Sequence, residues 1–122
     1  MATDKTTDVQ QLRNLVQKFV DDRDWSKYHN PKDLAISIAI EASELLELFQ
    51  WIKENQLAKI TENPKKLVEL KEELADIIIY CLSLANVLDV DVSRAVVEKI
   101  SKNEEKYPTE KVKGDYKKYT EL

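Results

Sequence analysis

Residues 63–88 read NPKKLVELKEELADIIIYCLSLANVL and predict one long helix. Asn63 is a good helix cap, and Pro64 suits the first helical position, where the missing N–H is no loss. From Ile77 to Leu88 the segment is apolar on nearly every side. A helix of this kind lies at the centre of a bundle or in a subunit interface. A chain of 122 residues has few elements to cover such a helix, so the segment favours an all-α fold that forms an oligomer.

The same start signals predict three further helices. Asn30-Pro31 repeats the cap of the long helix, Thr7 and Gln10 have the spacing of a capping box, and Asp91 is a candidate cap. The expected helices cover about residues 7–22, 31–53, 64–88 and 92–106. The chain has one glycine, which argues against hairpins and against glycine-rich phosphate loops.

Composition limits the class of protein. We expect one domain over residues 1–122, in which residues 109–122 form a polar tail that is disordered or packed on a neighbour. Hydrophobic residues make up 43% and charged residues 34%, which suits a globular protein. The net charge of −4 argues against nucleic-acid binding, and no segment reads as a signal peptide or a membrane span. We therefore expect a cytoplasmic protein.

Two pairs of carboxylates carry the chemistry. Glu41 and Glu44 form one pair and Glu73 and Asp76 the other, and each spacing places both side chains on one face of a helix. Both pairs adjoin apolar segments, where unpaired negative charge is unfavourable. If the two helices pack, the acids surround one volume that attracts a cation. Carboxylate oxygens without His or Cys favour Mg²⁺, or Mn²⁺, over zinc.

Spacing alone leaves other interpretations open. Acid pairs of this type are common on solvated helix faces. The other candidate residues also have ordinary structural roles: packing for the aromatic side chains, exposure for the polar ones, and a structural hydrogen bond for the only histidine. They are Trp25, His29, Glu47, Trp51, Tyr80, Lys99 and Asn103.

A set of motifs resembles one known family. The motifs are Arg23-Asp24-Trp25, His29-Asn30-Pro31, Glu41-Ala42-Ser43-Glu44-Leu45, Leu48-Phe49-Gln50-Trp51, Glu72-Glu73-Leu74-Ala75-Asp76, Lys106-Tyr107-Pro108 and Lys118-Tyr119-Thr120-Glu121-Leu122. Together they resemble the MazG-like all-α nucleoside triphosphate pyrophosphohydrolases, and most of all the dCTP pyrophosphatase branch. The resemblance covers roughly Phe19 to the C-terminus, and Ser43 departs from it where relatives often carry glycine.

The resemblance implies roles for particular residues. Glu41, Glu44, Glu73 and Asp76 would be the magnesium ligands. In such a site, a nearby carboxylate that is not fully engaged with the metal, Glu44 or Glu47, would accept the proton of the attacking water. The substrate-binding residues would be Trp25 and Trp51 around the base, Tyr80 near the sugar, and Lys99 and Asn103 at phosphate and sugar. The family fold is a four-helix bundle that assembles as a dimer or as a dimer of dimers.

The reaction implied is hydrolysis of a deoxynucleoside triphosphate, with dCTP preferred, between the α- and β-phosphates. It yields a monophosphate and pyrophosphate and clears unwanted nucleotides. A broad-specificity enzyme of the same family is one alternative, and a non-enzymatic helical oligomerisation module is another. A di-iron bundle is disfavoured because it needs Glu-x-x-His pairs, and His29 is not placed to form one.

Overall fold

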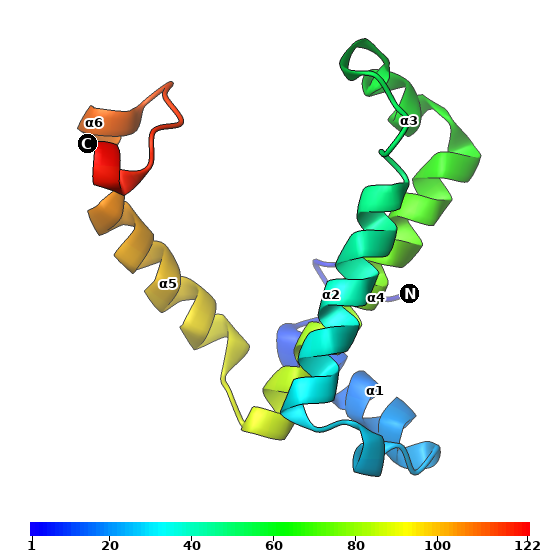
Figure 1. The fold of residues 1–122 in the computed structure, drawn as a ribbon. Helices are drawn as coiled ribbons and strands as arrows, with labels where there is room; N and C mark the ends of the chain where they lie inside the picture. Colours follow the sequence, from blue (N-terminus) through cyan, green and yellow to red (C-terminus); the bar gives the residue numbers. More distant parts are fainter. The chain divides into compact units, whose positions relative to one another are not determined.

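The computed structural model describes all residues, Met1–Leu122, and is entirely helical (Figure 1). Its elements are α1 (Val9–Asp22), η1 (Ser26–Tyr28), α2 (Pro31–Glu47), η2 (Glu54–Gln56), α3 (Ala58–Glu62), α4 (Pro64–Leu88), α5 (Val92–Lys106), α6 (Thr109–Val112) and η3 (Tyr119–Glu121). The contacts divide the chain into two compact units, Met1–Asp89 and Val90–Leu122. The predicted all-α class and its four long helices are confirmed.

Side chains cap the long helices where the sequence predicted. Asn30 accepts a hydrogen bond from the backbone N–H of Asp33 at 2.9 Å, and Asn63 accepts from that of Lys65 at 3.1 Å. Asp91 accepts from the N–H of Arg94 at 2.9 Å at the start of α5. Each bond satisfies a donor that the helix itself leaves unpaired.

Two boundaries differ from the prediction. The capping box of α1 is formed by Asp8 and Gln11, not by Thr7 and Gln10, and its two side chain–backbone bonds are both 2.8 Å long. Asp8 has the same spacing to a glutamine as Thr7, and aspartate is the better cap. Helix α2 ends at Glu47 and does not continue to residue 53, because the next N–H groups bond only three residues back, as Phe49 does to Leu46 at 2.9 Å.

The first unit is built around α4. Helices α2 and α4 run antiparallel side by side, and α1 packs on α4 (Figure 1). The buried side chains come from all of these helices and from α3: Val16, Val20, Leu34, Ile60, Leu82, Ser83 and Ala85. Arg13 of α1 joins the core contacts through its side chain, which donates to Asn86 Oδ1 at 2.9 Å, while Asn86 donates back to the Arg13 carbonyl at 3.2 Å. This packing fixes α2 and α4 against one another along the segments that carry the acids.

The second unit contains α5, α6 and η3. The polar tail folds locally, since the rings of Tyr107 and Tyr119 meet edge to face at 6.0 Å. Lys106 Nζ lies 4.9 Å from the centre of the Tyr119 ring, within the range of a cation–π contact. No helix of either unit has both the length and the hydropathy that a membrane span requires.

Candidate metal centre and adjoining cavity

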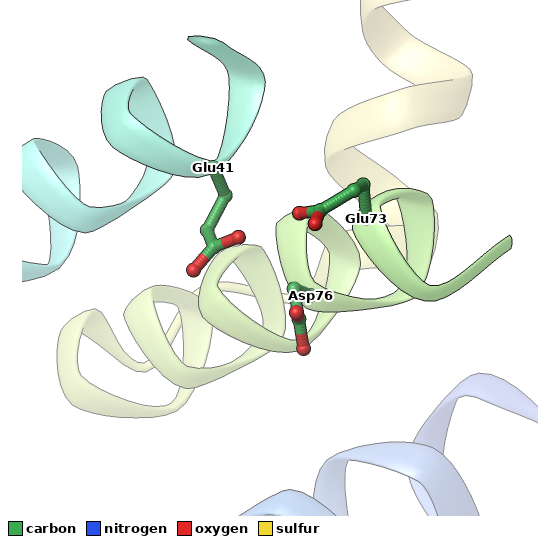
Figure 2. Close-up of side chains that lie close together, drawn as sticks. All are labelled: Glu41, Glu73 and Asp76. Carbon is green, nitrogen blue, oxygen red and sulfur yellow. The ribbon is translucent and has the colours of Figure 1, made fainter. Parts of the chain in front are cut away.

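Three carboxylates from two helices converge. Glu41 of α2 and Glu73 and Asp76 of α4 each offer an oxygen, and these oxygens lie within 4.8 Å of one another. Figure 2 shows Glu41 extending from its helix toward α4, where Glu73 and Asp76 lie one turn apart. The antiparallel packing of α2 on α4 therefore brings together acids that are far apart in the sequence.

Two carboxylate oxygens of this cluster have no hydrogen-bond partner. Oε2 of Glu41 and Oε2 of Glu73 are buried and have no hydrogen-bond partner in the protein. A buried carboxylate oxygen without a partner is unfavourable, and several such oxygens around one point make a site for a cation. Hard oxygen donors at this spacing suit Mg²⁺ or Mn²⁺.

The electrostatics of the group agree with its geometry. Burial, followed by the neighbouring Glu44 carboxyl, raises the pKa of Glu41 from 4.5 to about 7. Burial and Glu44 also raise the pKa of Glu73, although its contact with Glu41 lowers it. Besides burial, the groups that raise these two pKa values are neighbouring carboxyls, so the charged form of each acid is disfavoured by the others.

Glu44 and Glu47, the two candidates for the general base, differ in their surroundings. Glu44 is half-buried one turn after Glu41, and it influences both Glu41 and Glu73, although it lies outside the closest group of three. Glu47 is the exposed last residue of α2. Of the two, Glu44 is the one next to the carboxylate cluster.

A cavity of about 710 Å³ adjoins the carboxylates within the first unit. Glu41, Asp76 and Tyr80 contribute to its wall on one side, and Trp25 and His29 contribute from the segment around η1. The rest of the wall is mainly apolar and comes from α1 and α4: Leu12, Leu15, Val16, Phe19, Val20, Ala75, Ile78, Ile79, Leu82 and Ser83. An apolar cavity with a few polar groups has the form of a small-molecule site. A cation held by the adjoining carboxylates would attract an anionic group of that molecule.

Trp25 and Trp51, the two residues predicted to contact the nucleobase, lie in different surroundings. Trp25 lines the cavity and packs edge to face on Phe19, with ring centres 5.7 Å apart. Trp51 lies in the turn after α2 with 86% of its surface exposed, and it does not line the cavity. The alternative that Trp51 is a core residue is therefore wrong for the single chain, because no other part of the chain covers it.

Lys99 and Asn103 lie on α5 in the second unit, one helical turn apart, and both are exposed. Their shared helix face agrees with the sequence analysis.

Helix α1 contributes to the cavity wall, which the sequence pattern did not predict. Leu12, Leu15 and Phe19 of α1 line the cavity. Leu15 is 60% exposed and Phe19 48% exposed, which is unusual for the apolar face of a packed helix. The predicted structural hydrogen bond of His29 is present, since its Nδ1 lies 3.4 Å from Ser83 Oγ, and the ring also contributes to the cavity.

Comparison with known proteins identifies the family. The MazG-like family matches residues 36–122, which is well over half of the chain. The chain belongs to the MazG-like family. The resemblance predicted from the sequence motifs is thereby confirmed.

Relatives and a solved structure support the same assignment. The chain is 37% identical to dCTP pyrophosphatase 1 of Rattus norvegicus over 114 residues, 93% of this chain and 67% of the relative. It is 35% identical to dCTP pyrophosphatase 1 of Homo sapiens, with the same coverage of 93% and 67%. The crystal structure of a pyrophosphatase from Archaeoglobus fulgidus has a TM-score of 0.75 and 44% identity, covering 81% of this chain and 91% of that one.

Proposed function

We propose that this MazG-like protein is a Mg²⁺-dependent pyrophosphohydrolase that acts on deoxynucleoside triphosphates and prefers dCTP. The broader enzyme class, nucleoside triphosphate pyrophosphohydrolase, is supported by the family and by its pyrophosphatase relatives. These findings also argue against the non-enzymatic helical module. The metal, the base preference and the residue roles are the new content of the proposal.

One observation carries the proposal more than any other. The cluster of Glu41, Glu73 and Asp76, with two buried carboxylate oxygens that lack partners, adjoins an apolar cavity. A nucleoside triphosphate has the complementary form, because its phosphates need cations and its base is flat and poorly hydrated. The cluster would bind the metal and the cavity would bind the nucleoside.

The residues of the proposed site bind the metal, accept a proton or contact the substrate. Glu41, Glu44, Glu73 and Asp76 would hold Mg²⁺, which when bound neutralises phosphate charge and favours ionisation of a water molecule. The carboxylate that is not fully engaged with the metal, Glu44 or Glu47, accepts the proton of the attacking water. Trp25 contacts the base from the cavity wall and Tyr80 contacts the sugar, whereas Trp51, which does not line the cavity of the single chain, would contact the base from another subunit.

The phosphate end requires positive and polar groups. Lys99 offsets the charge of the departing pyrophosphate, and Asn103 hydrogen-bonds phosphate or sugar oxygens. Attack by water at the α-phosphorus breaks its bond to the bridging oxygen and leaves a nucleoside monophosphate and pyrophosphate. Lys99→Ala is expected to impair turnover of every triphosphate alike, because the phosphates are common to all of them.

The test is incubation of the protein with each of the deoxynucleoside triphosphates, with and without Mg²⁺, and separation of the products by chromatography. We expect dCMP and pyrophosphate as the first products, formed fastest from dCTP and only with the metal. A nucleoside diphosphate and orthophosphate as first products would contradict the cleavage position. Equal rates for all bases would instead support the broad-specificity enzyme.

A further inference from the structure

Ser83 is a polar residue in a mainly apolar part of α4. It follows Leu82 in the segment from Ile77 to Leu88, and only 5% of its surface is exposed. A buried hydroxyl is unfavourable unless it forms a hydrogen bond. The Ser83 hydroxyl therefore needs a hydrogen-bond partner inside the protein.

That partner is the imidazole of His29. Serines within helices commonly donate to the carbonyl four residues earlier, as Ser43 does to Ala39 at 3.0 Å. Ser83 instead lies with Oγ 3.4 Å from Nδ1 of His29, in the segment after η1. The Ser83 hydroxyl has a single proton, and this proton is paired with His29 only if Nδ1 is the acceptor. In a neutral imidazole, an accepting Nδ1 leaves the ring proton on Nε2.

Both residues belong to the wall of the apolar cavity. The His29 ring lies 6.5 Å from the ring of Trp25, which lines the same wall. His29 is therefore one of the few polar groups in a wall that is mainly apolar, and in the Nε2–H tautomer its free ring nitrogen would be a hydrogen-bond donor. A donor in such surroundings discriminates strongly, because a ligand that lacks the matching acceptor leaves the donor unpaired.

We propose that Ser83 is a positioning residue that fixes His29 as the Nε2–H tautomer, so that the imidazole donates a hydrogen bond to an acceptor on the bound nucleobase, such as a pyrimidine carbonyl oxygen. This inference rests on the proposed function, since it takes the cavity as the nucleoside site. It adds a specificity determinant on α4 that acts through another residue.

The kinetic test uses Ser83→Ala, with Ser43→Ala as a matched control that also removes one helical hydroxyl. We expect Ser83→Ala to raise KM for the preferred nucleotide about threefold to tenfold, which is the effect of losing one ordinary hydrogen bond. The kcat should stay within about twofold, because a contact equal in ground and transition states affects binding alone. The melting temperature should hold or rise, since a methyl group replaces a buried hydroxyl.

His29 is the only histidine, so its ¹⁵N resonances report the tautomer without ambiguity. In the nucleotide-free protein we expect the Nε2–H form to dominate, and a mixture of tautomers in Ser83→Ala. A dominant Nδ1–H form in the unmodified protein would overturn the inference, as would an unchanged KM and tautomer in Ser83→Ala. The NMR measurement needs no turnover, whereas failure of the proposed function would show as absence of pyrophosphate release by the unmodified protein.

Discussion

Glu41 and Glu73 occupy surroundings that disfavour their charge. Their buried Oε2 atoms lack partners, and burial together with nearby carboxyls raises both pKa values. A group in this condition destabilises the metal-free protein and binds a cation strongly once one is present. Activity and metal-free stability are therefore expected to respond in opposite directions when one of these acids is neutralised.

Glu73→Gln is expected to lower kcat/KM by about 100-fold or more, because loss of a direct ligand exceeds the effect of losing an outer partner. Melting temperature without metal should hold or rise, since repulsion within the cluster falls. Glu72→Gln is the matched control, because Glu72 is the exposed neighbour on the same helix. Full activity in Glu73→Gln, or an equal loss in Glu72→Gln, would refute the ligand assignment.

The pH dependence of stability has a definite sign. Glu41 has a pKa of about 7 in the folded protein against 4.5 as the reference value, so between these values the folded state binds more protons than the unfolded state. Metal-free stability should therefore fall as pH rises from about 4.5 to about 7. Thermal unfolding in a chelator over this range should show a decline in the unmodified protein and a flatter profile in Glu41→Gln. A rise over the same range would contradict the pKa shift.

Trp51→Ala tests a base contact at an exposed side chain. Trp51 is 86% exposed, so its loss should change the unfolding free energy by no more than about 0.5 kcal/mol. Loss of stacking on a base should weaken binding of dCTP by about 1–3 kcal/mol, seen as a higher KM. Trp25→Ala serves as the comparison from the cavity wall. An equal loss of activity on all four deoxynucleotides, with a clear drop in melting temperature, would contradict the proposed base contact of Trp51.

The residues at the end of α4 and at the start of α5 affect the stability of these two helices. Asp89 ends α4 with φ of 53° and ψ of 46°, a left-handed conformation that strains a side chain and suits glycine. Asp91 begins α5 and caps it. These two aspartates are close in sequence and have opposite effects on their helices, because a negative charge is favourable at a helix start and unfavourable at its end.

We expect Asp89→Gly to raise the unfolding free energy by about 0.5–1 kcal/mol. Asp91→Ala should lower it by about 1 kcal/mol, since a cap is lost. Urea unfolding of both variants measures the two effects. Changes of the same sign in both would show that the local helix-end argument fails here.

Local sequence signals predicted where the helices begin, but they did not predict which residues the helices pack against. The Asn-Pro pairs identified the starts of α2 and α4 because a cap and a proline act within a single turn. The end of α2 lacked such a marker, and the chain turns after Glu47 without glycine or proline. The acid pairs were found from spacing, whereas the cavity wall from α1 and the contact of His29 with Ser83 depend on tertiary packing, which spacing does not encode.

The single chain leaves much of its apolar surface exposed to solvent. Only six hydrophobic residues are buried, whereas Ile78, Val87 and Leu88 of α4 are each more than 40% exposed. On α5, Val96, Val97 and Ile100 are each more than half exposed. Soluble monomers rarely tolerate this much exposed apolar area, so the sequence-based prediction of an oligomer gains a structural argument.

We expect the protein to be a dimer or a tetramer at low micromolar concentration. Light scattering coupled to gel filtration measures the mass, and dilution should reduce melting temperature because association stabilises the folded chain. Val97→Arg, which places charge on the exposed face of α5, should shift the mass downward if α5 takes part. A monomeric mass with full activity would refute the prediction.

The two tryptophans differ in a way that an optical experiment can use. Trp25 packs on Phe19 at the cavity, and Trp51 faces water. Their emission spectra should therefore separate, with the indole of Trp51 shifted to the red and more accessible to a soluble quencher. In a Trp51→Phe variant the remaining fluorescence would come from the cavity wall alone, and its change on titration would report nucleotide binding without any turnover.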